Sequence, residues 1–225
     1  MTSRQLLEID TVPGILQLPN AAERAPAVLL LHGLNSRKER LADTIGRSLL
    51  ARGVASLAID LPAHGGRDEG SEAISLQNPL ALVRAWRRAI READHGLEFL
   101  ASHPDIDVER IAIAGYSLGA YLALFVAAEN PDVRAVALVA GGDLPQGIPM
   151  EKLVRSAADP RKAVRELNGR PLLMVNGRND TTILPAQATA LFEYASEPKE
   201  LVWYAGGHWP PERVTRDVAE WLARV

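Results

Sequence analysis

Cysteine is absent from this 225-residue chain. Its absence excludes a disulfide framework, a thiolate zinc site and a cysteine nucleophile, so any catalysis must use other side chains. Long apolar runs are absent as well, and no stretch approaches the ~20 residues that span a bilayer. Positive charge is not in excess, because 25 Lys and Arg against 28 Asp and Glu give a net charge of -3. Such a chain lacks the excess of positive charge that binds the phosphate backbone of nucleic acids.

The first eight residues contain no basic segment followed by an apolar one, which is the pattern of a secretory signal. We therefore expect a cytoplasmic protein with no membrane partner and no nucleic acid partner. Its length fits one compact domain over residues 1–225, since single cores grow to ~250–300 residues before they split. The hydrophobic content of 47% is ordinary for a globular protein with a sizeable core.

Six short apolar runs recur along the chain and predict strands. They are rich in Val, Ile and Leu without polar alternation, as is typical of parallel strands that helices cover on both faces. The predicted strands are residues 27–31, 54–59, 110–114, 133–139, 171–175 and 200–204. Residues 6–18, interrupted by Pro13 and Gly14, are expected to form an antiparallel hairpin at the sheet edge.

Helix-length amphipathic segments separate these strands. The pattern is best developed over residues 75–101, where apolar residues recur at steps of three and four. These residues are Leu76, Leu80, Val83, Ile90, Ala93, Leu97 and Leu100. Further helices are predicted at 38–52, 118–129, 185–195 and 211–224. The alternation predicts the α/β class, with a doubly wound, mostly parallel sheet that binds ligands at the carboxyl ends of its strands.

Residues 115–119 match the pattern G-x-S-x-G between a predicted strand and a predicted helix. We call this turn the elbow. Gly115 and Gly119 permit a sharp strand-to-helix turn that larger side chains would block, and the turn would present Ser117 at the sheet edge. The context predicts that Ser117 is a nucleophile. A plain turn serine is the alternative interpretation.

A serine hydroxyl needs a base to take its proton, and imidazole titrates in the required range. His208 is the leading candidate because it follows the last predicted strand and so lies at the carboxyl edge of the sheet. His95 and His103 lie in or after the long helix, where a structural role is expected. His64 also follows a strand, but it precedes the serine, and we rank it well below His208.

The imidazole in turn needs a carboxylate that fixes its tautomer and stabilises its protonated form. Asp180 ends a polar loop after the predicted strand 171–175, immediately before the strand that leads to His208. Asp143, which follows the preceding strand, is the alternative, and for both aspartates the other interpretation is that they only cap a turn.

An oxyanion intermediate needs two hydrogen-bond donors. We nominate the backbone N–H groups of Leu118, just after the serine, and of Leu34, in the loop after the first parallel strand. His32 in that loop is expected to be a structural hydrogen-bonding residue. The histidines are dispersed and lack metal-ligand spacing, so no metal and no cofactor are expected.

Five ordered landmarks together resemble the α/β-hydrolase superfamily, and within it the dienelactone-hydrolase-like and prolyl-oligopeptidase-like serine esterases. They are residues 32–34, residues 60–65, the elbow, residues 177–180 and residues 207–209. The resemblance implies the α/β-hydrolase fold and cleavage of carboxylic esters through an acyl-enzyme, with Ser117, Asp180 and His208 as catalytic residues. Dienelactone hydrolases proper use cysteine, which this chain lacks.

The superfamily often carries a lid in the stretch equivalent to residues 143–170, which here is short. Met150, Leu153 and Val154 followed by Ala157 and Ala158 are expected to form one or two small helices that either cap the site or pack on the body. A small cap favours small to medium acyl esters. The alternatives are thioester cleavage or acyl transfer with the same residues, then a peptidase, and outside enzymes a catalytically silent binding protein of this fold. The sequence indicates no oligomeric state.

Overall fold

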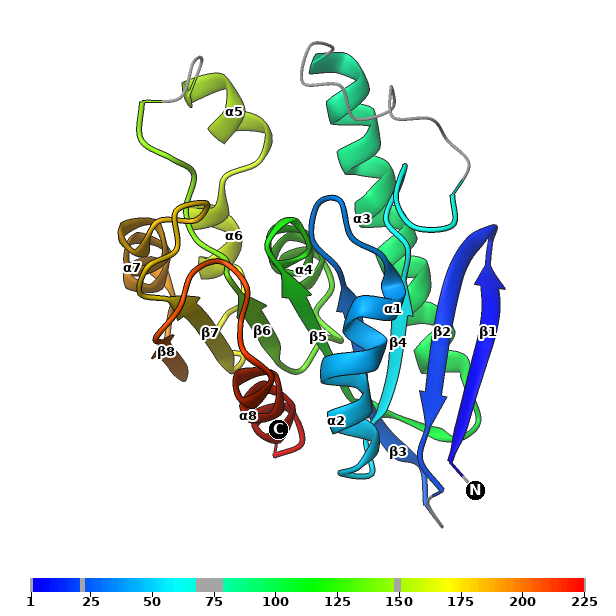
Figure 1. Ribbon diagram of the computed structural model, residues 1–225. Helices are drawn as coiled ribbons and strands as arrows, with labels where there is room; N and C mark the ends of the chain where they lie inside the picture. The colour runs from blue at the N-terminus through cyan, green and yellow to red at the C-terminus, as the bar shows by residue number, and fades with distance from the viewer. Residues whose placement is uncertain (1, 21–22, 68–78, 148–150, 225) are drawn as a thin grey trace.

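An eight-stranded sheet forms the centre of the molecule (Figure 1). The computed structural model describes residues 2–20, 23–67, 79–147 and 151–224. The strand order is β1-β2-β4-β3-β5-β6-β7-β8. The strands are β1 Ser3–Ile9, β2 Val12–Leu18, β3 Ala25–Leu31, β4 Ala55–Ile59, β5 Ile106–Tyr116, β6 Val136–Val139, β7 Leu172–Gly177 and β8 Lys199–Tyr204.

Strands β3 to β8 all pair in parallel, which confirms the predicted doubly wound, mostly parallel sheet. All six predicted runs contain a strand. Strand β5 is longer than predicted, since it starts at Ile106, and β6 starts only at Val136 although the apolar run begins at 133. The side chains of β3, β4 and β6 are almost all buried, because helices cover both faces of the sheet.

The predicted hairpin is present, and β2 also joins the sheet by antiparallel pairing with β4. Its turn differs from the sequence interpretation. The chain reverses at Asp10 and Thr11, which have φ of 47° and 73°, whereas Pro13 and Gly14 lie inside β2. Two consecutive residues with positive φ make a tight turn whose twist matches the flanking strands, and Asp tolerates this conformation better than most residues do.

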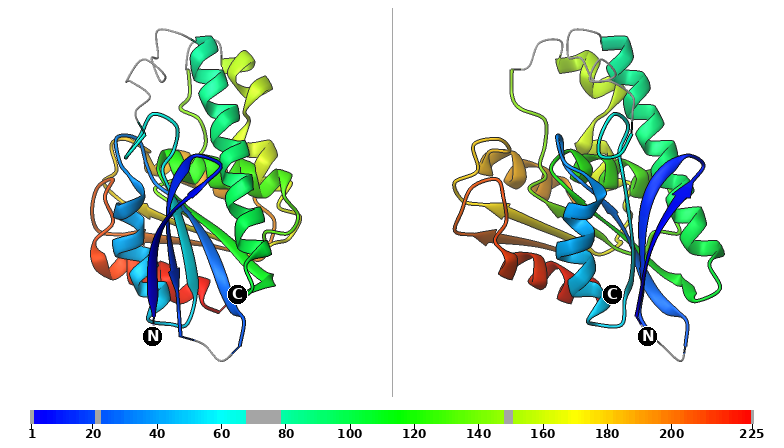
Figure 2. Two further views of the ribbon diagram at one scale, coloured as in Figure 1. Left: turned by 90° about the vertical axis from the view of Figure 1, so that its right-hand side faces the viewer. Right: turned by 45° about the vertical axis from the view of Figure 1, so that its right-hand side comes forward.

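Helices pack on both faces of the sheet (Figure 2). The predicted helix 38–52 is observed as α1 Lys38–Leu41, the π-helical turn η1 Ala42–Gly46 and α2 Arg47–Leu50. Together with α8 Glu212–Leu222 these elements bury one apolar cluster against the sheet. The second cluster lies under α3 Pro79–Ser102, α4 Leu118–Glu129, α6 Pro160–Arg165 and α7 Pro185–Tyr194. Helix α5 Glu151–Ala157 stands further from the sheet (Figure 1).

Helix α3 confirms most of the predicted helix 75–101. Residues 75–78, including Leu76, lie outside the described residues, and so does the side chain of Leu80. Of the predicted apolar stripe, Ala93, Leu97 and Leu100 are buried, whereas Val83 is 41% exposed. Within the described residues, no helix is both long and apolar enough to cross a membrane.

The strand order reverses direction at one point of the sheet, between β3 and β5. From β3 the chain goes to β4 on one side, and then returns to β5 on the other side. At such a reversal the loops after the two neighbouring strands diverge and leave room at the carboxyl edge, where open α/β sheets bind ligands. The loop after β3 and the elbow after β5 both lie at this point. One domain over residues 1–225 stays a prediction.

Candidate active site

The elbow holds Ser117 in a strained conformation. Ser117 has φ of 53° and ψ of -114°, a region that L-residues rarely adopt. Its N–H donates to the Val139 carbonyl at 2.9 Å, which ties the turn to β6. A Cβ atom at Gly115 would come 2.0 Å from the Gly119 carbonyl oxygen, and one at Gly119 would come 2.0 Å from that of Leu31. Both positions therefore require glycine, as the motif predicted.

His208 connects the serine to a buried carboxylate. The Nε2 atom of His208 lies 2.9 Å from the Ser117 hydroxyl, and its Nδ1 lies 2.8 Å from Oδ2 of Asp180. The Asp180 side chain is fully buried, while that of His208 is 19% exposed. The other carboxylate oxygen, Oδ1, accepts the backbone N–H groups of Thr182 at 2.8 Å and Ile183 at 3.0 Å. With both oxygens engaged, the carboxylate has a fixed orientation toward the imidazole.

Two tyrosines that the sequence did not single out hold the backbone at His208. The Tyr204 hydroxyl donates to the carbonyls of Gly207 at 2.9 Å and His208 at 3.1 Å, and the Tyr116 hydroxyl lies 3.3 Å from the His208 carbonyl. Burial, reinforced by the nearby Asp180 charge, raises the pKa of Tyr204 to about 12, and burial also raises the pKa of Tyr116. Both hydroxyls therefore stay protonated as donors. Tyr116 occupies a variable position of the elbow motif, and Tyr204 ends a strand, so neither carried a recognisable signal.

The alternative carboxylate, Asp143, has different partners. Arg155 binds it through two hydrogen bonds of 2.9 and 3.0 Å, and Arg161 adds one from Nε at 2.8 Å. Burial by itself raises the pKa of Asp143, but these bonds and the Leu144 N–H outweigh it and lower the pKa overall. Asp143 thereby anchors α5 and α6 to the end of β6. No hydrogen bond or ion pair joins it to His208 among the described residues.

The remaining histidines lie outside this arrangement. His95 pairs with Asp10 at 3.0 Å, and His103 accepts the N–H of Asp105 at 3.2 Å. His64 is buried, with Nδ1 2.7 Å from the Pro62 carbonyl. His32 is also buried. Its Nδ1 lies 2.8 Å from the Gly33 carbonyl, and its Nε2 accepts the Leu61 N–H at 3.1 Å, as expected of a structural hydrogen-bonding residue.

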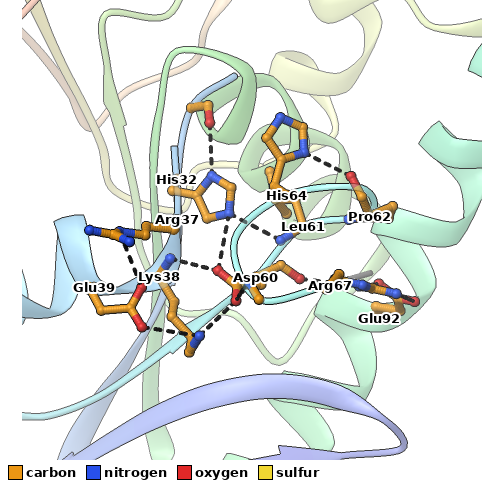
Figure 3. A network of polar contacts seen from close by, with 12 residues as sticks. His32, Arg37, Lys38, Glu39, Asp60, Leu61, Pro62, His64, Arg67 and Glu92 are labelled. Atoms are coloured by element: carbon orange, nitrogen blue, oxygen red, sulfur yellow. Dashed lines mark hydrogen bonds and ion pairs between the residues drawn. The ribbon is translucent and has the colours of Figure 1, made fainter. Parts of the chain in front are cut away.

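His32 lies beside a buried carboxylate that links the loops after β3 and β4 (Figure 3). Asp60 accepts the backbone N–H of Lys38 at 2.8 Å, its ammonium group at 2.7 Å, and the N–H of Gly66 at 3.0 Å. Burial alone raises the pKa of Asp60, but the Lys38 and Gly66 bonds outweigh that effect and lower it overall. We call these contacts the Asp60 network. It fixes the loop after β3, which lies next to the elbow, to the loop after β4.

The nominated oxyanion donors lie next to Ser117. Leu118 is the first residue of α4. In the first turn of a helix no preceding carbonyl accepts the backbone N–H groups, so the Leu118 N–H has no partner within the helix. A Cβ atom at Gly33 would come 3.3 Å from the Cβ of Ser117, which places the backbone that leads into Leu34 against the serine. The donor roles of both N–H groups stay predictions.

The stretch 143–170 forms two helices, as expected. Helix α6 buries Ala163 and Val164 and packs against α4 and α7, so this half belongs to the body of the molecule. Val154 in α5 is 37% exposed. Met150 and the side chains of Leu153 and Ala157 lie outside the described residues, so the apolar side expected for α5 is not described. A capping role for α5 stays a prediction. The described residues contain no group of three or more His, Asp or Glu suited to a metal.

Known proteins resemble this chain in sequence. The sequence model of the dienelactone hydrolase family matches residues 12–208. The polyketide transferase ATR5 of Stachybotrys chlorohalonatus is 29% identical over 76% of this chain and 56% of its own length. The thiohydrolase apmlB of Arthrinium phaeospermum is 28% identical over 85% of this chain and 59% of its own length. The esterase FrsA of Escherichia coli is 29% identical over 56% and 28%, respectively. The chain thus spans less than two thirds of the length of ATR5 and of apmlB, and less than one third of the length of FrsA.

Solved structures confirm the fold class. TT1662 from Thermus thermophilus superposes with a TM-score of 0.80 at 24% identity, covering 100% of this chain and 99% of that one. Est1E from Butyrivibrio proteoclasticus, solved with ferulic acid bound, has a TM-score of 0.76 at 19% identity and covers 98% of both chains. The alpha/beta hydrolase GrgF from Penicillium sp. sh18 has a TM-score of 0.74 at 18% identity, covering 100% of this chain and 98% of its own. At these identities the likeness establishes the α/β-hydrolase fold and no more.

Proposed function

Because this chain belongs to the dienelactone hydrolase family, we propose that it is a serine hydrolase that cleaves carboxylic esters. The observation that carries the proposal is the unbroken line of contacts from the Ser117 hydroxyl through His208 to Asp180, at 2.9 and 2.8 Å. Such spacing suits proton transfer, and the strained φ of Ser117 is the kind of conformation found at functional sites.

In the proposed mechanism His208 Nε2 takes the Ser117 proton as the hydroxyl oxygen attacks the ester carbonyl. The carbonyl oxygen becomes an oxyanion, which accepts hydrogen bonds from the N–H groups of Leu118 and Leu34. The intermediate collapses, and His208 gives its proton to the departing alkoxide, which leaves as the alcohol. Water then attacks the acyl-enzyme as His208 takes its proton, and the second intermediate collapses as His208 returns that proton to the Ser117 oxygen and the acid leaves. Asp180 stabilises the imidazolium in both steps.

We propose small to medium acyl groups as substrates. The support is that α6 packs on the body, so that among the described residues of 143–170 only α5, seven residues long, is left for the proposed cap. The assay is hydrolysis of p-nitrophenyl esters of graded acyl length. Acetate and butyrate esters should react faster than long-chain esters, and equal or greater rates on long chains would contradict this preference.

A thioesterase or acyltransferase is the second candidate. It is favoured by the names of two relatives, a thiohydrolase and a polyketide transferase. The same residues serve both reactions, since only the leaving group or the acceptor changes. Parallel assays with an acetyl ester, an acetyl thioester and an added alcohol acceptor separate them, because transfer yields a new ester and hydrolysis yields free acid.

The proposal is tested with the substitution Ser117→Ala. Turnover of p-nitrophenyl acetate should fall by about four to six orders of magnitude with the fold intact, as loss of a serine nucleophile does elsewhere. A fluorophosphonate probe should label the unmodified protein and not the variant. Unchanged esterase activity in Ser117→Ala would refute the assignment, and absence of labelling in both would favour a binding protein. A cytoplasmic location and a small-molecule ester partner belong to the same proposal.

A further inference from the structure

An open groove of about 540 Å³ lies beside the candidate active site, and the proposed mechanism makes no use of its charges. Its lining residues are Asn35, Ser36, Arg37, Arg40, Gly65 and Trp209. Two are arginines and none is acidic, although the chain as a whole carries a net charge of -3. We call this cavity the Arg40 groove.

A series of ring contacts connects the groove to His208. The Tyr116 ring lies 5.2 Å from the His208 ring, and the Trp209 ring stacks on Tyr116 at 4.5 Å with an interplanar angle of 22°. The Arg40 guanidinium lies 4.6 Å from the centre of the Trp209 ring. The general acid must reach the leaving oxygen to protonate it, so the leaving group departs past His208. Trp209 follows His208 in the chain and lines the groove, so a leaving group that passes His208 can extend into the groove.

Among the described residues around the groove, one cation has no carboxylate partner. Arg37 Nε lies 3.8 Å from Oε2 of Glu39, and the other oxygen of Glu39 lies 3.2 Å from Lys38 Nζ. Lys38 also pairs with Asp60, so three cations including Arg40 face two carboxylates. Among the residues that the structure describes, no carboxylate lies within ion-pair distance of Arg40. A cation–π contact engages no hydrogen-bond acceptor, so it leaves the N–H donors of a guanidinium available for an anion.

The walls of the groove are held in place before any ligand binds. Asp60 accepts both the backbone N–H and the ammonium group of Lys38, which lies between Arg37 and Arg40 in the chain. The same carboxylate accepts the N–H of Gly66, next to Gly65, which also lines the groove. A preorganised cation loses less entropy on binding than one on a free loop.

We propose that the Arg40 groove is a subsite for an anionic group, a carboxylate or a phosphate, carried by the leaving group of the ester or thioester. This inference rests on the proposed function, because the leaving-group direction follows from His208 as general acid. Arg40 supplies the charge and the N–H donors, Trp209 supplies an aromatic ring in the lining, and the side chains of Asn35 and Ser36 supply further polar groups.

The test compares substrates that share the acetyl group and differ only in the leaving group. They are 4-acetoxybenzamide, which is neutral, 4-acetoxybenzoate and 4-acetoxyphenyl phosphate. The unmodified enzyme should cleave at least one anionic ester with kcat/KM about tenfold above that of the benzamide, as one charge-assisted contact provides. The larger of the two ratios identifies whether carboxylate or phosphate is the natural group. Equal kcat/KM on all three esters would overturn the subsite.

Two charge-matched variants locate the effect. Arg40→Gln should abolish the preference and leave kcat/KM for the benzamide unchanged. Arg47→Gln removes the same charge from an exposed arginine of α2 outside the groove, and should keep the preference. A loss on all three esters in Arg40→Gln, or an equal loss of preference in Arg47→Gln, would overturn the proposal.

A binding measurement separates this inference from the proposed function. The indole N–H resonance of Trp209, assigned with Trp209→Phe, is followed during titration with 4-hydroxybenzoate, phenyl phosphate and the neutral 4-hydroxybenzamide. At least one anion should bind about tenfold more tightly than the amide, and Arg40→Gln should remove the difference. If the protein cleaves no ester but this result holds, only the proposed function fails. If esters are cleaved in a Ser117-dependent manner and the three ligands bind equally, only the subsite fails.

Discussion

Replacing Asp180 by asparagine tests the hydrogen-bond geometry of the site. In the structure Oδ1 of Asp180 accepts two backbone N–H groups, from Thr182 and Ile183, and Oδ2 faces His208 Nδ1. The asparagine oxygen must take the place of Oδ1, because the reverse orientation would set the amide NH2 against two backbone donors, of which that of Ile183 is buried. Each unsatisfied donor costs ~1–3 kcal/mol.

The amide NH2 then faces Nδ1 of His208. That nitrogen must accept a hydrogen bond, so the imidazole proton moves to Nε2, and Nε2 no longer accepts the Ser117 proton. We expect kcat/KM for p-nitrophenyl acetate to fall by about 10⁴-fold, or about 5.5 kcal/mol in the activation barrier, as loss of the correct tautomer does in other serine hydrolases.

Asp143→Asn is the matched control. In the natural protein the Asp143 carboxylate binds Arg155 and Arg161. The variant should therefore lose about 2 kcal/mol of stability in urea unfolding while its kcat/KM stays within about threefold of the natural value. The assay is steady-state hydrolysis at pH 8, with circular dichroism to verify folding. More than a tenth of normal activity in Asp180→Asn, or an equal loss of activity in Asp143→Asn, would refute the reasoning.

Three further predictions concern the surroundings of the site. Gly119→Ala should destabilise the fold by about 3 kcal/mol or more in urea unfolding, because its Cβ would meet the Leu31 carbonyl at 2.0 Å. Gly66→Ala is the control and should have a mild effect, because the nearest neighbour of its Cβ would lie at 3.7 Å. Similar losses of stability in the two variants would contradict this prediction. Tyr204→Phe removes the hydroxyl that holds the His208 carbonyl and should lower kcat about fivefold with KM little changed, and unaltered kinetics would show that the hydroxyl has no positioning role. Burial lowers the pKa of His32 to about 4, so the unfolded chain takes up this proton near pH 6.5 and the folded protein only near pH 4. The contribution of neutral His32 to the free energy of unfolding is therefore complete above pH 6.5 and is lost as the pH falls toward 4. Acidification from pH 7 to 5 should lower the free energy of unfolding by about 2 kcal/mol more in the natural protein than in His32→Gln. An equal loss of stability in both proteins would disprove the prediction.

The fold class and the elbow were predictable because their signals are local. A continuous run of Val, Ile and Leu predicts a buried parallel strand wherever it occurs, and the spacing of glycines in G-x-S-x-G reflects a clash within a five-residue turn. The positions of Ser117, Asp180 and His208 followed from the same logic, since each comes directly after a predicted parallel strand, and the carboxyl ends of such strands share an edge. Their contacts bear out this placement, while their catalytic roles stay the proposal.

What the sequence alone left open depends on contacts between distant segments. Asp143 and Asp180 were alternatives, and only the tertiary structure shows that Arg155 and Arg161 engage the first while His208 meets the second. The hairpin turn lies at Asp10 and Thr11 and not at Pro13 and Gly14, because the register between β1 and β2 and the pairing of β2 with β4 place Pro13 and Gly14 inside a strand.

The two tyrosine hydroxyls and the Arg40 groove belong to the same category. Tyr116 and His208 are 92 positions apart, and Arg40 and Trp209 are separated by most of the chain. Short-range periodicity and glycine sterics are encoded within one turn or strand, so they can be recognised along the chain. A hydrogen bond or ring stack between distant residues exists only after the sheet has brought their loops together, and no local pattern specifies it.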